Sequence, residues 1–234
     1  MERLYRGYMA RLYRGYILVY NHLKYSSNMS LSLEQQLNYW TKYFHSHPND
    51  IRGYIQRGMV YFKLAKIAES IQDFDHAEQL DPSIKPYLWQ RGLSYYYAEQ
   101  YQLGAEQFEI DLTVNSQDVE ETVWRYLCIA QFQGVEVAKN TLLPVKNDPR
   151  PVLRSVYDLF AGNCTPEDLL KIGQKQGKQG NFYSHLYLGL YYEAEQNIEL
   201  AKTYINQAAT EYEIDDYMWN LAVVHQKIKF GIEF

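Results

Sequence analysis

The sequence predicts an all-α protein, a solenoid of antiparallel helix pairs with about twelve helices. Two observations lead to this fold class. Residues of the same type recur with a spacing of 34 positions, a period typical of helical repeat arrays. Each period also holds two amphipathic stretches separated by a short turn. A pair of such short helices buries its apolar stripes only when neighbouring pairs stack on it.

The 34-residue period is clearest in the first half of the chain. It contains an arginine followed by glycine, a tyrosine three positions later, a phenylalanine in the second helix and a proline. The recurring residues are Arg57-Gly58 with Arg91-Gly92, Tyr61 with Tyr95, Phe74 with Phe108 and Pro48 with Pro82. Four coincidences at one spacing indicate a repeated structural unit.

The first period contains both helices of a pair. One helix face is marked by residues three or four positions apart, namely Tyr54, Arg57, Gly58 and Tyr61. After a turn, a second stripe is formed by Ile67, Ser70, Ile71, Phe74 and Ala77. We expect the second helix to end before Pro82, because proline cannot continue a helix and restricts the residue before it.

These residues make the chain resemble the tetratricopeptide repeat family over about residues 31–229. The family expects an aromatic residue at place four, Gly or Ala at eight, Tyr at eleven and an aromatic residue at twenty-four of each unit. The first two units supply Tyr54, Gly58, Tyr61 and Phe74, then Leu88, Gly92, Tyr95 and Phe108. The resemblance implies a right-handed solenoid in which Gly58 and Gly92 let the two helices of a pair approach closely.

We expect a repeat domain over residues 29–230. Its clear units are 51–84, 85–118 and 182–215, its degenerate unit is 119–152, its short unit is 153–181 and its capping helix is 216–229. Two local signals support helix starts within it. Ser32 opens a capping box with Gln35. Thr165 is placed as an N-cap before Pro166, which suits the first helical position.

Residues 1–28 differ from the rest of the chain. The segment from Arg3 to Tyr8 recurs unchanged from Arg11 to Tyr16, and a period of eight fits neither helix nor strand packing. This region has five basic residues and one acidic residue, a net charge of +4. The remainder has 18 basic and 27 acidic residues, a net charge of −9. We expect a loose extension or a misassigned start here.

A narrower resemblance lies in the second half of the chain. The run from Phe182 to Tyr192, which follows an irregular section and precedes a terminal helix, is similar to the NlpI-like family of bacterial envelope lipoproteins. In that family the repeats act as an adaptor for proteases and peptidoglycan hydrolases. No cysteine precedes Cys128, so this chain departs from the family's lipobox pattern.

Composition and charge exclude several classes. Two cysteines cannot form a disulfide framework, and no run of about 20 apolar residues exists to span a membrane. We therefore expect a cytoplasmic protein. The acidic body disfavours nucleic acid as a partner.

We predict no enzyme activity, no cofactor and no metal. His45 and His47 are read as exposed helix-end residues, and Cys128 as a buried apolar one. The pairs Glu120-Glu121 and Asp215-Asp216 are read as helix-start acids and solvated faces.

The predicted function is a non-catalytic scaffold that binds a peptide or helix of a partner protein in its concave groove. The alternative is an adaptor that presents clients to a protease or hydrolase. The resemblance places these groove candidates on the first helix of each unit: Arg52, Ile55, Met59, Phe62, Lys63, Trp89, Leu93, Tyr96, Tyr97, Glu120 and Leu127. Packing between units is the alternative role for Trp89 and the tyrosines. Trp219 and Leu221, with no following unit to cover them, make a homodimer through the terminal helix one possible assembly.

Overall fold

A computed structural model describes residues 31–232, and over that range the chain is all-helical, with no strand. The duplicated hexapeptide and the other expectations for residues 1–28 lie outside the described residues. The helices are α2 Leu33–Ser46, α3 Ile51–Lys63, α4 Ile67–Leu80, the 3-10 helix η1 Pro82–Tyr87, α5 Trp89–Tyr97, α6 Tyr101–Asp111, α7 Val119–Gln133, α8 Val135–Asn140, α9 Pro151–Phe160, α10 Pro166–Lys175, α11 Gly177–Ala194, α12 Ile198–Thr210 and α13 Tyr217–Phe230.

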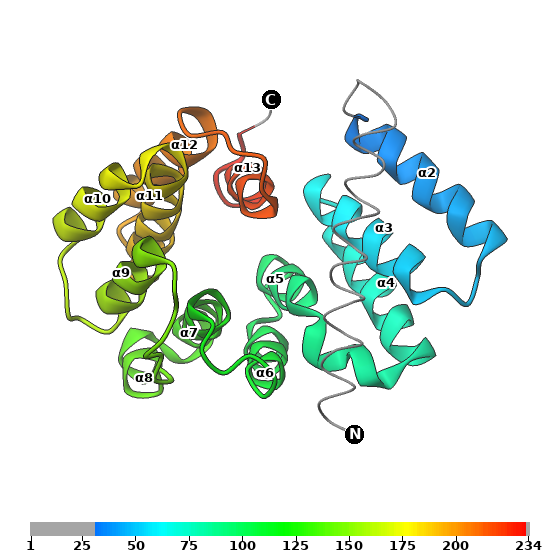
Figure 1. The fold of residues 1–234 in the computed structure, drawn as a ribbon, viewed down its shortest axis with the longest axis horizontal. Helices are drawn as coiled ribbons and strands as arrows, with labels where there is room; N and C mark the ends of the chain where they lie inside the picture. Colours follow the sequence, from blue (N-terminus) through cyan, green and yellow to red (C-terminus); the bar gives the residue numbers. More distant parts are fainter. Residues whose placement is uncertain (1–30, 233–234) are drawn as a thin grey trace.

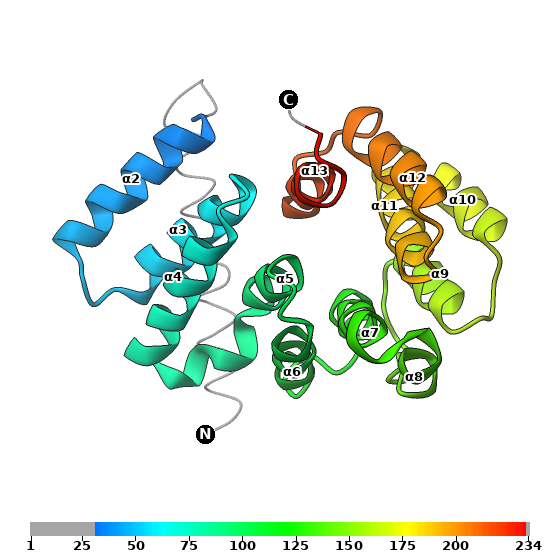
Figure 2. The same ribbon diagram turned by 180° about the vertical axis from the view of Figure 1, so that it is seen from behind.

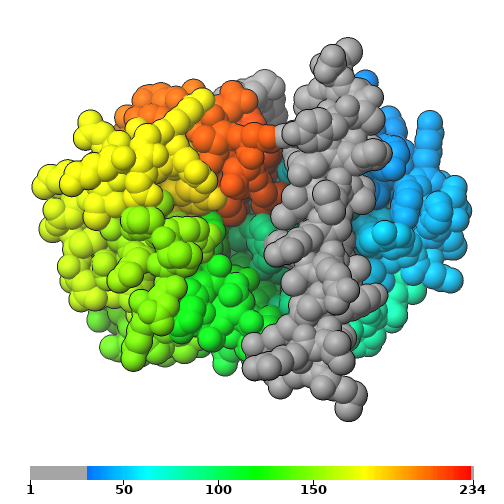
Figure 3. Space-filling model, viewed as in Figure 1, coloured from blue at the N-terminus to red at the C-terminus, as the bar shows by residue number. Residues whose placement is uncertain are grey.

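Consecutive helices pack as neighbouring pairs, which confirms the predicted all-helical class. The most extensive associations join α11 with α12, α3 with α4, α6 with α7, α10 with α11, and α5 with α6. The helices follow an arc from α2 to α12, and α13 turns back into the opening of that arc (Figures 1 and 2). In the space-filling view, the green, yellow and orange residues of the later helices form one continuous packed surface (Figure 3).

Local signals in the sequence set several helix ends. Ser32 and Gln35 form the expected capping box at the start of α2, with hydrogen bonds of 2.8 and 3.2 Å. Thr165 caps α10 in the same way, with Pro166 at its first position. α4 ends at Leu80, two residues before Pro82. The structure confirms these ends. They were predictable because short-range hydrogen bonding and proline sterics determine them.

The glycines of the repeat pattern lie where two helices approach closely. A Cβ atom on Gly92 would lie 2.7 Å from Cζ of Phe108, while one on Gly58 would lie 3.3 Å from Cβ of Asp73. The expected close approach is confirmed in both units.

Three arginines repeat the 34-residue spacing in the structure as well as in the sequence. Arg57 donates to Asp73 at 2.7 and 2.8 Å. Arg91 donates to Gln107 at 2.7 and 3.0 Å, and Arg125 donates to the carbonyl oxygen of Thr141 at 2.9 Å. Each partner follows its arginine by 16 residues. The third member extends the period into residues 119–152, where the sequence signature is weak.

The glycine-rich stretch Lys171 to Gly180 forms the end of α10 and the start of α11. Gly173 lies within α10 and Gly180 within α11, and only Gly177, with φ of 68°, makes the turn. A Cβ atom on Gly173 would lie 2.8 Å from the carbonyl oxygen of Gly180. The glycines therefore serve a helix–helix crossing, and α11 begins five residues before the expected unit start at 182.

The apolar core divides into two parts of unequal size. The larger one runs from Phe62 on α3 to Val224 on α13 and includes the buried apolar side chains of α5, α7, α9 and α11. The smaller one lies at the N-terminal end of the arc and consists of Tyr54, Ile55, Phe74, Ala77, Ile84 and Leu88.

Candidate functional site

Helix α13 covers much of the inner side of the arc. The ring of Tyr217 stacks on Phe62 with centroids 5.5 Å apart, and Tyr97 Oη lies 3.0 Å from Nδ1 of His225. Near the end of the helix, Lys229 Nζ donates to the hydroxyl of Tyr101 at 3.2 Å. The protein therefore places α13 between α3 and α12, where its side chains also contact α5 and α6 (Figure 1).

This position corrects the premise that α13 presents uncovered apolar residues. Leu221 is fully buried. Trp219 is partly buried, and its Nε1 donates to the carbonyl oxygen of Ala209 at 3.0 Å. The body of the protein covers both residues, so neither supplies the exposed face from which a homodimer was inferred.

Five of the eleven predicted groove residues are buried in the larger core. Phe62, Leu93, Tyr96, Tyr97 and Leu127 all belong to the larger core and are at most 4% exposed. Apart from Leu93, which borders the cavity described below, these residues are closed off from a partner in this conformation. Their visible role is helix packing, which is the role that the sequence had allowed for the tyrosines.

The other groove candidates lie in the smaller core, at the surface or beside the cavity. Ile55 and Met59 belong to the smaller core or pack on it. Arg52 is exposed and pairs with Asp50, the N-cap of α3. Lys63 lies over the ring of Tyr217, with Nζ 5.4 Å from the centroid.

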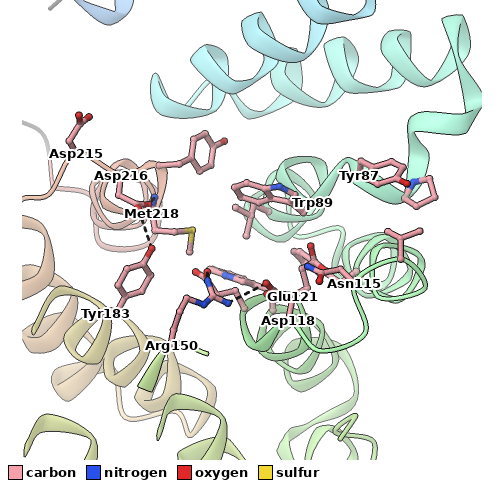
Figure 4. A pocket seen from close by; sticks show the side chains of 17 residues that line it. Tyr87, Trp89, Asn115, Asp118, Glu121, Arg150, Tyr183, Asp215, Asp216 and Met218 are labelled. Atoms are coloured by element: carbon pink, nitrogen blue, oxygen red, sulfur yellow. Dashed lines mark hydrogen bonds and ion pairs between the residues drawn. The ribbon is translucent and has the colours of Figure 1, made fainter. Parts of the chain in front are cut away.

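A cavity of about 990 Å³ lies between the middle of the arc and the start of α13 (Figure 4). In Figure 4, Trp89 enters it from α5, while Met218 and Tyr183 face it from α13 and α11. Its walls thus come from segments far apart in the sequence. The lining residues are Pro86, Tyr87, Trp89, Leu93, Phe108, Val114, Asn115, Asp118, Glu120, Glu121, Trp124, Arg150, Tyr183, Asp215, Asp216, Tyr217 and Met218.

Arg150, the N-cap of α9, organises one wall of the cavity. Its guanidinium pairs with Glu120 at 2.6 Å, Asp118 at 3.2 Å and Asp148 at 2.6 Å. Tyr187 also donates to Glu120 at 3.1 Å. Burial raises the pKa of Glu120 to about 7, although Arg150 opposes that rise. One positive charge is therefore shared among three carboxylates.

Glu121 is the most perturbed carboxyl group of the lining. Burial, with the charges of Asp118 and Asp111 adding to it, raises its pKa to about 9, so the group carries a proton at neutral pH. Its Oε2 accepts no hydrogen bond from any described residue. The buried atoms Trp124 Nε1 and Tyr217 Oη also have no hydrogen-bond partner within residues 31–232.

An aromatic corner forms another part of the lining. The rings of Trp89 and Tyr217 meet edge to face, with centroids 5.4 Å apart and an interplanar angle of 84°. Asp216 fixes the start of α13, because it accepts hydrogen bonds from the backbone of Met218 at 2.8 Å and from Tyr183 Oη at 3.1 Å. Asp216, the N-cap of α13, and the Tyr183 hydroxyl group on α11 thus hold Tyr217 beside Trp89.

Three of the predicted groove residues line the cavity: Trp89, Leu93 and Glu120. The reading of Glu120 and Glu121 as solvated acids is corrected. They do lie in the first turn of α7, but both are partly buried in the cavity wall. Sequence reasoning missed Arg150 and Tyr183, since neither stands at a repeat-signature place. The only available signal was the set of acids at the starts of α7 and α13.

The described residues contain no group of three or more His, Cys, Asp or Glu that could hold a metal ion. None of their helices combines the length and hydropathy that crossing a bilayer requires. No protein-family profile matches the chain, and no curated protein is significantly similar to it.

Proposed function

We propose that the protein is a non-catalytic scaffold that binds a segment of a partner protein at the cavity on the inner side of the arc. The observation that carries this proposal is the cavity itself. Its volume of about 990 Å³ is at the upper end of the range typical of ligand sites. Its walls combine indole and phenol rings with polar groups, which is the composition of binding sites rather than of sealed cores.

The repeat architecture supports the same proposal. We propose that the helix pairs form a right-handed, tetratricopeptide-like solenoid. The arginine series supports this arrangement, because Arg57, Arg91 and Arg125 each donate to a residue 16 positions further on. Stacked units of this kind present a preformed inner surface, which lowers the ordering entropy that binding must overcome.

Trp89→Ala tests this function directly. Trp89 is partly buried, lines the cavity and lies at the start of α5, so its removal takes away ring surface at the site. Loss of an aromatic anchor costs roughly 1–2 kcal/mol of binding, or about a tenfold rise in Kd. Affinity capture from an extract by the wild-type chain, followed by titration of the recovered partner against both proteins, measures it.

Leu103→Ala is the matched control, because Leu103 is an exposed apolar residue on α6 outside the cavity lining. It should bind the partner as the wild type does. A folded Trp89→Ala protein with unchanged affinity would refute binding at the cavity.

The adaptor role is a second proposal, and it requires a second surface. Phe132 on α7 and Val137 on α8 are exposed apolar residues that do not line the cavity. They offer a separate place for a hydrolase. In a double pull-down, Phe132→Ser should release the hydrolase and keep the client, whereas Trp89→Ala should do the reverse. Loss of both partners in either variant would argue against two surfaces.

A further inference from the structure

The charge of the cavity lining is strongly unbalanced. Five carboxyl groups line it, namely Asp118, Glu120, Glu121, Asp215 and Asp216, and Arg150 is the basic residue among the lining residues. Arg150 is also shared with Asp148 outside the lining. Even with Glu121 protonated, negative groups outnumber the positive one. A cleft with low-dielectric walls and one sign of charge attracts ligands of the opposite sign.

The aromatic corner suits a cation as well. Ammonium and guanidinium groups bind over indole and phenol rings within about 6 Å of the ring centroid. The structure already contains such a contact, since Nζ of Lys63 lies 5.4 Å from the centroid of Tyr217. Trp89 meets Tyr217 at 84°, so the two rings form adjoining walls rather than a closed stack.

The buried polar atoms indicate that the ligand is a polypeptide rather than a simple amine. When a ligand's cation displaces the proton of Glu121, its Oε2 becomes an acceptor, and no described residue donates to it. Trp124 Nε1, on a residue only 2% exposed, is a donor without an acceptor among the described residues, and Tyr217 Oη can act as either. A basic peptide provides both kinds of group, because its side chain donates and its backbone carbonyls accept. A buried donor or acceptor without a hydrogen-bond partner destabilises the protein until a ligand supplies that partner.

We propose that the cavity binds an extended segment of a partner protein through an arginine or lysine side chain, which lies between the carboxylates and the corner formed by Trp89 and Tyr217. The proposal rests on the proposed function and specifies the chemistry of the partner. The same charge distribution repels acidic segments, so selectivity for basic sequences follows from the lining itself.

A peptide titration tests the proposal. The probe is a fluorescein-labelled nonapeptide of alternating arginine and alanine, acetylated and amidated at its ends. Its control replaces arginine with citrulline, which keeps the shape and removes the charge. Fluorescence anisotropy with the full-length protein should give a Kd about tenfold lower for the arginine peptide, and the advantage should shrink at high salt. A glutamate peptide should not bind.

The double variant Glu121→Gln/Asp215→Asn removes the negative charge of Asp215 and replaces the unpartnered carboxyl group of Glu121 with an amide, and it should weaken binding of the arginine peptide about five- to tenfold. These side chains can change without removing the N-caps Asp118 and Asp216. Glu69→Gln, at an exposed acid on α4 outside the lining, is the charge-matched control and should leave the Kd unchanged. Circular dichroism and a thermal unfolding midpoint check folding. Asp215→Asn alone gives a second, milder variant.

The outcomes distinguish a failure of this proposal from a failure of the proposed function on which it rests. If the citrulline peptide binds as tightly as the arginine peptide, and Trp89→Ala weakens both, the cavity binds peptides but the preference for cations is refuted. If no peptide binds and Trp89→Ala leaves partner capture unchanged, both proposals fail. If a synthetic peptide of residues 1–17 binds far more tightly than the arginine probe, the occupant is this chain's own basic segment, and the assignment to a partner is overturned.

Discussion

Gly92 lies so close to Phe108 that the residue at this place decides the separation of α5 and α6. A Cβ atom there would lie 2.7 to 3.0 Å from three ring carbons of Phe108, which is only 1% exposed and cannot swing away. We expect Gly92→Ala to destabilise the fold by about 1–3 kcal/mol, because overpacking outweighs the better helix propensity of alanine. Urea unfolding measures the difference.

Gly58 provides the matched comparison at the same place of the preceding unit. Its added Cβ atom would meet no atom closer than 3.3 Å. There the gain of up to about 1 kcal/mol in helix propensity should offset the contact. Gly58→Ala should therefore be close to neutral. Equal losses in the two variants would contradict the argument from separation.

Glu121 should make stability depend on pH. Its pKa is raised to about 9 in the folded protein, against an ordinary value of 4.5. The folded state therefore holds a proton that the unfolded state loses, and this contribution to stability is full below pH 4.5 and disappears as the pH rises through 9. Asp118, Asp111 and Glu120 face the same group and keep its charged form unfavourable.

Glu121→Gln removes that titration. Its free energy of unfolding should be close to that of the wild type near pH 5 and should exceed it by roughly 1 kcal/mol or more at pH 8.5. Urea unfolding at pH 5, 7 and 8.5 measures the difference between the two proteins at each pH. A constant difference across the range would show that Glu121 ionises normally in the fold.

At the scale of helices, the arginine series ties each helix pair together. The side chain of Arg91 is 4% exposed and bonds Gln107 on α6 as well as Asp75 and Glu78 on α4. Arg91→Gln leaves these groups without their donor, so we expect a loss of about 3 kcal/mol in thermal or urea unfolding.

Arg125 stands at the same place in the next unit and serves as the control. Its carboxylate partner Glu109 is 64% exposed, and such pairs contribute about 0–1 kcal/mol. Arg125→Gln should therefore cost clearly less than Arg91→Gln. An equal loss would mean that position in the repeat, rather than burial of the ion pair, determines the effect.

Helix ends were predictable where local chemistry sets them, as at Ser32, Thr165 and Pro82. The 34-residue phase was also readable, because helix pairing repeats the same few side chains. The place of α13 was not readable. It depends on contacts such as that between Tyr97 and His225, which lie 128 positions apart. The cavity also depends on contacts between segments far apart in the sequence. For this reason a family pattern, applied unit by unit, selected groove candidates that α13 and the core bury.

Across the whole molecule, the two cores predict graded stability along the arc. α2 has one buried residue, Trp40, and packs chiefly on α3. α11 lies at the centre of the larger core, with α7, α9, α10 and α12 packed around it. Where helices pack mainly on their neighbours, stability is close to a sum of neighbour terms, so the end with fewer neighbours opens first.

Hydrogen exchange followed by mass spectrometry reads this gradient helix by helix. Amides of α2 should exchange at least about tenfold faster than those of α11, because local opening of α2 exposes one large side chain while opening of α11 disrupts the core. α13 should be protected nearly as well as α11, although it is the last helix described, since it packs on α12 and α3 at once. Exchange of α13 as fast as that of α2 would show that it leaves the inner face readily. In that case the buried tyrosines Tyr96 and Tyr97 would become accessible to a partner after all.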